Sequence, residues 1–429
     1  MIVSDALEVP PEKTKLLRLT AKELQEEYNC RTYHLRAEED GLVTAEGEEV
    51  VYPFPEPYTL FVAAPEFNLG YNPETRQLFG LDRTMTRGPF NPPFNFFRYF
   101  DTRGYEMLFC ATGSCVSQFI EGATTLIGGS PETTCAAVFH ERIFAAKGER
   151  LFYCKALDGH YWSKERYGGG YIDLNTSGGG EIIHMLPYRD RLILMRRNGI
   201  STLRVLGDEL NFKVLNLPAR GGNLLSSGVA MCGDSIGYLT DRGFYLFNGA
   251  TSAAAENSRC EEIDLSKPVR AIAYRGRFYA LVTQKEGRNA IYCYNPDSKQ
   301  AHFIENGAEQ FDCGDALYFV RDRMVYRVSE QGLCQDFMPY FTAEHIAFSP
   351  GGDKRLRRIA IEGEGEFSVS ITSKYGTRTV TGRAQEVLKL RSPLRGHGFD
   401  LKISAAGENA DKVRFQAVSL QWTEENNDN

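Results

Sequence analysis

The chain has 429 residues, 42% of them hydrophobic, and carries 49 Lys and Arg against 56 Asp and Glu, a formal charge of −7. Nucleic-acid coats need concentrated positive charge, so this balance argues against that role and against nucleic-acid contact by the chain as a whole, while leaving a local basic face possible. No apolar run reaches about 20 residues, which argues against a membrane-spanning helix.

The N-terminal stretch MIVSDALEVPPEK lacks a basic start followed by an apolar run, so we expect no secretion signal and no membrane association. The ten cysteines include no C-x-x-C pair and mostly fall inside apolar runs. We expect them to be reduced and to pack as small hydrophobic residues, as in a reducing cytoplasm. Abundant Gly, Tyr and Phe favour many short strands joined by tight turns.

Residues 1–55 are predicted to be a mainly irregular N-terminal segment with one short helix. Thr20 and Glu23 have the spacing of a capping box, which predicts a helix near 20–28. Residues 42–45 and 49–52 are expected to form strands.

From about residue 104 onward, an apolar strand, a short polar turn and a second apolar strand recur. Four of these turns are His-Glu-Arg (140–142), Arg-Asp-Arg (189–191), Gly-Asp-Ser (233–235) and Arg-Gly-Arg (275–277). Turns of this kind suit β-hairpins, because Gly and Asp accept positive φ angles. The later copies lie about 40 to 50 residues apart, which is the length of a four-stranded propeller blade.

We therefore predict an all-β chain whose residues 56–340 form a β-propeller. A single blade cannot bury both faces, whereas several blades in a closed ring can. Five to seven blades fit this length, and six are expected.

Beyond about residue 340 the pattern changes to strict alternation of apolar and polar residues, for example over 366–372 and 413–422. Such alternation is typical of strands with one buried face. About six such strands predict a small C-terminal β-sandwich over 341–429.

No motif predicts a catalytic, cofactor-binding or metal site. The dipeptide Gly-Lys is absent, which excludes a Walker A loop, and the seven histidines never pair at metal-ligand spacing. We expect no cofactor and no enzymatic activity.

Two stretches are candidate interfaces. The first is a Phe-rich run between 90 and 100, in which core filling is the alternative to an intersubunit contact. The second is the basic run 354–358, in which a solvated strand face is the alternative to a contact with nucleic acid or an acidic partner. The candidate interface residues are Phe90, Phe94, Phe96, Phe97, Tyr99, Phe100, Arg355, Arg357 and Arg358.

The order of several motifs resembles the β-propeller structural proteins of tailed bacteriophages, the tail-nozzle and head-tail stabilisation group. The motifs that carry the resemblance are Arg142–Ala146, Leu151–Cys154, Asp158–Ser163, Gly168–Leu174, Tyr188–Met195, Gly199–Leu203, Gly237–Gly249 and Lys354–Ile361. The resemblance covers roughly residues 104–422, and nothing in the first 100 residues adds to it.

The resemblance implies a non-enzymatic phage or prophage virion protein of the neck or tail. Such a protein would act as an assembly subunit, form a homo-oligomeric ring and contact portal or tail subunits. It would be cytoplasmic during assembly and virion-bound afterwards. The alternatives are a carbohydrate-binding or glycoside-hydrolysing propeller and a bacterial protein-interaction scaffold.

Overall fold

The computed structural model describes residues 14–28, 30–38, 40–81, 86–120, 123–163, 168–174, 178–205, 211–218, 221–329, 339–347, 354–407 and 412–424. The chain divides into two compact units. Unit 1 comprises Met1–Glu49, Gln300–Asn306 and Val328–Asn429, and unit 2 comprises Val50–Lys299 and Gly307–Arg327. This division differs from the three consecutive ranges expected, because the N-terminal segment belongs to the same unit as the C-terminal strands.

Unit 2 is built of antiparallel sheets in which each strand pairs with the next strand along the chain. The first three sheets contain β6 (Leu60–Ala63), β7 (Asn68–Asn72), β8 (Gln77–Gly80) and β9 (Thr86–Arg87); β10 (Phe94–Phe100), β11 (Glu106–Thr112), β12 (Val116–Ile120) and β13 (Ala123–Leu126); and β14 (Cys135–Phe139), β15 (Arg142–Lys147), β16 (Arg150–Tyr153) and β17 (Gly170–Asp173).

The next sheets follow the same plan. They contain β18 (Ile182–Tyr188), β19 (Arg191–Arg196), β20 (Gly199–Arg204) and β21 (Lys213–Pro218); β22 (Leu224–Cys232), β23 (Ser235–Thr240), β24 (Gly243–Phe247) and β25 (Ser252–Ala254); and β26 (Arg270–Tyr274), β27 (Arg277–Thr283) and β28 (Asn289–Asn295). A short 3-10 helix, η3 (Cys260–Glu262), precedes β26.

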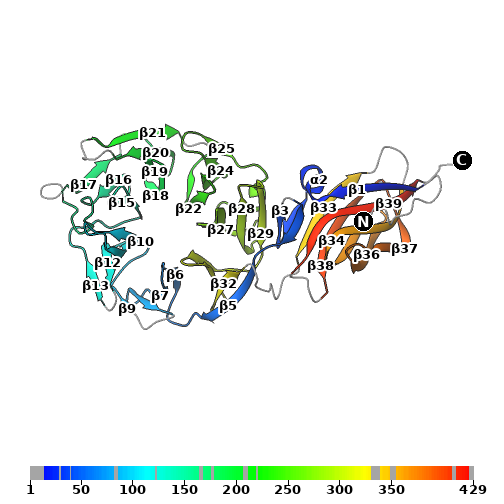
Figure 1. The fold of residues 1–429 in the computed structure, drawn as a ribbon, viewed down its shortest axis with the longest axis horizontal. Coiled ribbons are helices and arrows are strands. Elements are labelled where there is room, and N and C mark those ends of the chain that lie inside the picture. The colour runs from blue at the N-terminus through cyan, green and yellow to red at the C-terminus, as the bar shows by residue number, and fades with distance from the viewer. Residues whose placement is uncertain are drawn as a thin grey trace. The chain divides into compact units, whose positions relative to one another are not determined.

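The last sheet of unit 2 closes the ring with a strand from the N-terminal region. β30 (Gln310–Cys313), β31 (Leu317–Arg321) and β32 (Met324–Ser329) form a meander, and β5 (Gly47–Pro53) pairs with β32 as the fourth strand. From β10 onward the first strands of successive sheets contact one another, β30 contacts β6, and the first two sheets share a hydrophobic cluster, so the sheets form a closed circle (Figure 1). This arrangement is propeller-like.

The predicted hairpin turns lie at the same place in several of these sheets, between the first strand and the second. His140 and Glu141 both adopt positive φ angles (41° and 61°) in the turn between β14 and β15. Arg189 and Gly233 also have positive φ in the corresponding turns of later sheets. Paired strands joined through such residues follow the right-handed twist of the sheet, and these turns confirm the repeat seen in the sequence.

Hydrophobic clusters fill the spaces between neighbouring sheets of unit 2. Phe144, Leu192 and Leu194 belong to one such cluster, between the sheets of β14–β17 and β18–β21. Phe61, Tyr318 and Val325 belong to the cluster that joins the last sheet to the first. Each sheet is thus buried on both faces, which is the condition for a stable ring of blades.

Unit 1 contains two sheets whose apolar faces share one cluster that includes Phe341, Ile359 and Leu401. The first sheet has the order β3 (Leu35–Glu38), β4 (Gly41–Thr44), β39 (Arg414–Glu424), β34 (Lys354–Glu364) and β37 (Val387–Gly396), and β1 (Thr14–Thr20) also pairs with β39. The strands of unit 1 in the second sheet have the order β29 (Gln300–Ile304), β2 (Arg31–Tyr33), β33 (Tyr340–Ala347), β38 (Gly398–Ala406), β35 (Glu366–Ser373) and β36 (Gly376–Arg383).

The predicted helix is confirmed as α2 (Ala21–Glu27), with Thr20 and Glu23 forming the capping box. The Glu23 N–H donates to the Thr20 hydroxyl (3.2 Å), and the Thr20 N–H donates to the Glu23 carboxylate (2.7 Å). These hydrogen bonds satisfy backbone donors at the start of the helix and lower the pKa of Glu23. The expected strands near 42–45 and 49–52 are confirmed by β4 and β5.

Candidate functional site

The Phe-rich run forms β10 and the loop before it, and most of its rings point into the interior. Phe90, Phe94 and Tyr99 are buried. Phe96 and Phe97 are half-buried, against the clusters on either side of this sheet. Because a first strand lies between two neighbouring sheets, its side chains are covered on both faces, which favours the core-filling interpretation for these residues.

Phe100 is the exception, because its side chain is 50% exposed. It lies at the end of β10, close in sequence to Tyr105, which is 64% exposed. The turn between them is held by Asp101, whose carboxylate accepts hydrogen bonds from the Arg103 and Tyr105 N–H groups (2.8 and 2.9 Å). These bonds lower the pKa of Asp101, so an ordered turn presents both rings to solvent.

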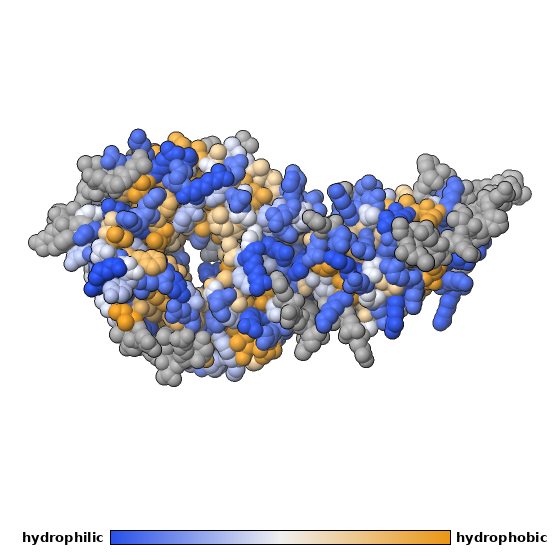
Figure 2. Space-filling model, in the orientation of Figure 1, coloured by the Kyte–Doolittle hydropathy of each residue, from blue (hydrophilic) through white to orange (hydrophobic). Residues whose placement is uncertain are grey.

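Further exposed apolar side chains occur on the outermost strands of three successive sheets. Leu126 on β13, Tyr171 on β17 and Leu215 on β21 are 54%, 53% and 56% exposed. We call these three residues the outer strip. In Figure 1 the three strands lie at the outside of the ring, and Figure 2 shows hydrophobic residues reaching the surface in this region. Sequence reasoning missed the outer strip because its residues lie about 45 positions apart and belong to different repeats.

The basic run lies on β34, where Arg355 and Arg357 are exposed and Arg358 is half-buried. The Arg357 Nε donates to the Thr423 hydroxyl of β39 (3.2 Å). The structure therefore places the Phe-rich run in unit 2 and the basic run in unit 1, as two separate features.

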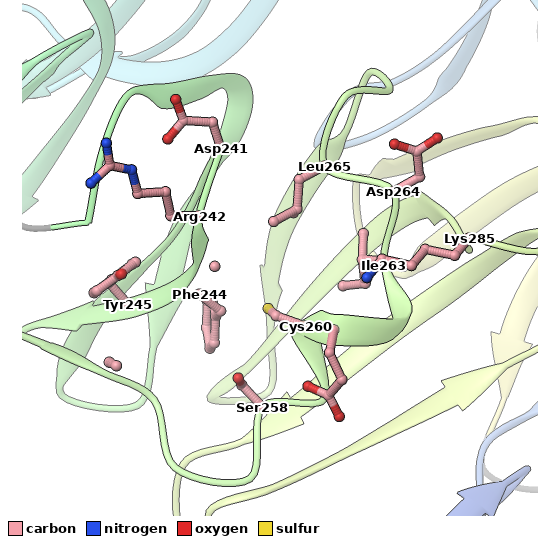
Figure 3. A pocket seen from close by; sticks show the side chains of 13 residues that line it. Asp241, Arg242, Phe244, Tyr245, Ser258, Cys260, Ile263, Asp264, Leu265 and Lys285 are labelled. Carbon is pink, nitrogen blue, oxygen red and sulfur yellow. The ribbon is translucent and has the colours of Figure 1, made fainter.

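A pocket lies in unit 2, between the β23–β24 turn and the segment that contains η3 (Figure 3). Its volume is about 500 Å³. Asp241, Arg242 and Tyr245 line one wall, and Asp264 and Lys285 line the other. One wall lies within the Gly237–Gly249 motif, but nothing in the sequence shows that this segment faces Asp264 and Lys285, which is why the pocket was not anticipated.

The charged groups of the pocket are held by neighbours. Both carboxylate oxygens of Asp241 accept hydrogen bonds from Asn223, through its N–H and its side-chain amide (3.0 Å each). The hydroxyl and N–H of Ser266 donate to Asp264 (2.6 and 3.1 Å) and lower its pKa. Both carboxylates are therefore held in place as hydrogen-bond acceptors.

Cys260 lies at the base of the pocket and is buried. Burial raises its pKa to about 12, so the sulfur is a thiol at neutral pH. Because the thiolate is the nucleophilic form, Cys260 is not activated for covalent catalysis. The pocket can bind a small polar molecule, but its sulfur is not poised to react.

A second cavity, of about 290 Å³, is lined by residues from the first strands of the ring. Arg270 of β26 donates to Asp312 of β30 (Nη2–Oδ1 2.7 Å), and Asp312 also accepts from the Ala63 N–H of β6 (3.0 Å). Asp312 raises the pKa of Arg270, whereas burial and the Arg270 charge lower the pKa of His184 to about 4. These polar groups tie together three strands that line the ring interior.

The described cysteines are all free, and most of them are buried. Cys334 lies outside the described residues. No group of three or more His, Cys, Asp or Glu side chains with metal-binding geometry occurs among the described residues. None of the helices in the described ranges is both long and apolar enough to cross a membrane.

The sequence matches no protein family and no curated protein. Among solved structures, the chain is similar to PorZ, a surface component of the type-IX secretion system of Porphyromonas gingivalis, with 10% identity, a TM-score of 0.36 and 90% of this chain covered. It covers only 59% of that protein. The Pan2 WD40 domain of Neurospora crassa has 9% identity and a TM-score of 0.37, covering 75% of this chain and 97% of that domain.

An exo-β-1,3-galactanase from Phanerochaete chrysosporium has 8% identity and a TM-score of 0.26, over 84% of this chain and 95% of the enzyme. Likenesses at this level carry no argument about function.

Proposed function

We propose that the chain is a non-enzymatic virion structural protein of a phage or prophage, acting as an assembly subunit of the neck or tail. The observation that supports this most directly is the outer strip. Monomeric proteins expose single apolar residues, but a series on the outermost strands of successive sheets of a rigid ring would suit an interaction surface. The order of sequence motifs, which resembles that of phage propeller proteins, supports the same proposal.

We further propose that unit 2 is a seven-bladed propeller, one blade more than the sequence suggested. The meander β26–β28 would be the sixth blade, and β30–β32 with β5 would be the seventh. Unit 1 would be a β-sandwich formed by its two sheets around their common cluster. A propeller closed by a strand from the other end of the sequence is stiff, which suits a subunit whose function is geometric.

The proposed assembly is a homo-oligomeric ring that contacts portal or tail subunits. Repeated heterologous contacts between copies generate closed rings when the rotation between copies closes. The outer strip would supply the apolar centre of such a contact. The protein would be cytoplasmic before assembly and part of the virion afterwards.

The test is to measure the mass of the purified protein by light scattering, alone and after co-expression with a portal protein encoded beside its gene. We expect a ring or a portal complex, and we expect Leu215→Asp, on the outer strip, to weaken or abolish it. Val50→Asp is the matched control, because Val50 is also 56% exposed but lies in the last sheet. The proposal would be contradicted if the protein stayed monomeric and did not bind the portal. It would also be contradicted if Val50→Asp disrupted the assembly equally.

The pocket of Figure 3 supports a second candidate, a carbohydrate-binding propeller. Carboxylates from both walls, together with Tyr245, offer acceptors and a ring face to a sugar. A glycan array combined with a hydrolysis screen distinguishes the two candidates. Binding that is lost in Asp241→Asn, or turnover of any glycoside, would favour the second candidate over the first.

A further inference from the structure

Unit 1 brings together two basic rows that are separate in the sequence. The first is Lys354–Ile361 on β34, with Arg355, Arg357 and Arg358, and the second lies on β37. The cations of the second row are Lys389, Arg391 and Arg395. Because β34 and β37 pair in antiparallel register, the two rows lie side by side. Neither 354–361 nor 387–396 contains an Asp or a Glu.

These cations project from one face of the sheet. Leu356 and Ile359 of β34, and Leu390 and Leu394 of β37, face the unit 1 core. Successive strand residues point to opposite faces, so the cations next to these core-facing residues point outward; the pairing is irregular between Leu356 and Arg358. We call the surface formed by Arg355, Arg358, Lys389, Arg391 and Arg395 the basic face. All of these side chains except the half-buried Arg358 are exposed.

The register places like charges directly opposite one another. Arg355 pairs with Arg395 across the two strands, and Arg358 pairs with Lys389. Cross-strand pairs of like charge are destabilising. Among the described residues, Arg358, Lys389 and Arg391 form no ion pair. Repulsion between these cations therefore destabilises the sheet, and a bound anion would relieve that repulsion.

The acid nearest to these rows on β34 is already engaged. Glu362 accepts two hydrogen bonds from Arg18 of β1 (2.7 and 2.5 Å). This bidentate pair raises the pKa of Arg18. Glu362 is thus paired with Arg18 and does little to neutralise the cations of the basic face.

The basic face continues around the edge of β37 to an exposed aromatic ring. Tyr375, in the turn between β35 and β36, is 49% exposed, and Lys374 and Arg395 lie over its ring (4.8 and 5.4 Å from the centroid). Arg378 of β36 reaches the same edge, where its Nε donates to the Ser392 hydroxyl (3.0 Å). In the view of Figure 2, hydrophilic residues project around this part of unit 1.

We propose that the basic face binds the phosphate backbone of a single-stranded nucleic acid, with Tyr375 as a stacking platform for a base. Lys389 and Arg391, at alternate positions of β37, are about 7 Å apart, and cations paired across the two strands are about 5 Å apart, so several cations can contact successive phosphates. Most of them are arginines, whose planar guanidinium binds phosphate through two hydrogen bonds. Cationic tracks flanked by exposed aromatic rings are typical of proteins that bind single strands.

This inference is independent of the proposed assembly role and differs from the expectation set by the net charge of −7. The net charge describes the whole chain, whereas binding depends on local concentration of charge. The acidic remainder of the molecule would repel phosphate and confine binding to this face.

The test uses the full chain and a fluorescently labelled oligothymidylate, with anisotropy measured at several salt concentrations. Four to six phosphate contacts predict a slope of log K against log salt of about −3 to −4. Lys389→Gln combined with Arg391→Gln should weaken binding and reduce the slope by about 1.4. The matched control is Arg103→Gln combined with Arg288→Gln, which removes the same charge from exposed positions of unit 2.

The aromatic contribution is tested separately. Tyr375→Ala should weaken binding about five-fold or more, whereas Tyr375→Phe should retain it, because stacking needs the ring and not the hydroxyl. Absence of binding, or equal loss in the control, would overturn the proposal. Binding of polyglutamate with the same affinity and salt slope would also overturn it and would indicate an acidic protein partner instead.

Discussion

The two units of this chain differ in which strands pair to form their sheets. In unit 2, almost every strand pairs with its neighbour in sequence, and only β5 arrives from a distance. In unit 1, pairs such as β1 with β39 and β4 with β39 join opposite ends of the chain. Local hairpins leave a repeated pattern in the sequence, whereas distant pairs leave none. Unit 2 is therefore the part whose architecture can be inferred, and distant pairing also predicts slower formation of unit 1.

The largest expected effect comes from removing residues 1–53, which deletes β1 to β4 from unit 1 and the closing strand β5 from unit 2. We expect both units to lose cooperative unfolding, which calorimetry would show as the loss of all transitions. Removing only residues 1–20 deletes β1 and the Thr20 cap of α2, both in unit 1, and should leave the unit 2 transition intact. Native-like unfolding of the longer deletion would show that the ring does not depend on β5.

The next largest effect is expected from large-to-small substitutions in the two cores. Phe144 of unit 2 and Phe415 of unit 1 are both fully buried. Phe144→Ala and Phe415→Ala should each reduce the free energy of unfolding by about 3–5 kcal/mol, through lost burial and a cavity. Denaturant titration should show each substitution affecting only its own unit, while the exposed Leu215→Ala should change stability by less than about 0.5 kcal/mol. Simultaneous loss of both transitions would mean that the units unfold as one.

A smaller effect is expected from pH, because burial, with a further contribution from His302, lowers the pKa of His34 in unit 1 to about 4. Its Nε2 accepts the Glu305 N–H (3.2 Å), which requires the neutral ring. Between pH 6.5 and 4 the unfolded chain binds a proton that the native state excludes, so stability is lost as pH falls through this range. The loss is up to about 3 kcal/mol.

His34→Asn removes this proton while keeping an acceptor and tolerating the positive φ of 54° at this position. Unit 1 of this variant should show a flatter dependence of its melting temperature on pH between 6.5 and 4.5. Unit 2 should keep its dependence, because the pKa of His184 is also lowered to about 4 and is untouched. An unchanged profile for unit 1 would assign its acid sensitivity to other groups.

The smallest effect concerns the basic face. Lys389→Glu would place a carboxylate opposite Arg358 and should stabilise unit 1 by about 0.2–1 kcal/mol, by replacing repulsion with attraction. The matched substitution Arg391→Glu changes the net charge equally without a paired cation across the strand, so it should gain less. Thermal melts of both variants measure this. An equal gain in stability would mean that the effect comes from the change in net charge and not from the pairing with Arg358.

What the sequence could predict follows from the same comparison. The capping box at Thr20, the hairpin turn at His140 and Glu141 and the alternation in the last 80 or so residues are local signals, and each predicted an element that the structure contains. The Phe-rich run was ambiguous because apolar residues look the same in a core and in an interface. Only the position of β10 between two sheets distinguishes the alternatives.

The candidate surfaces were harder to predict from the sequence, because each is formed by residues that lie far apart in the chain. The run 354–358 was visible, but Lys389, Arg391 and Arg395 are separated by apolar and neutral residues, and only the pairing of β34 with β37 makes one surface of the two. The pocket beside Cys260 was invisible for the same reason. One wall lies within the Gly237–Gly249 motif and the other in the segment around Cys260, and nothing in the sequence shows that the two meet.

The position of β5 has a consequence for how a cell makes this protein. The ribosome delivers β5 early, but its partner β32 is completed only after roughly 280 further residues, which takes about 14 to 55 s at ordinary rates of translation. During that interval the nascent chain holds an unpaired strand with Val50 and Val51 exposed even in the finished protein. Chaperones that bind extended apolar segments would therefore have the longest time to bind β5, the strand that later closes the ring.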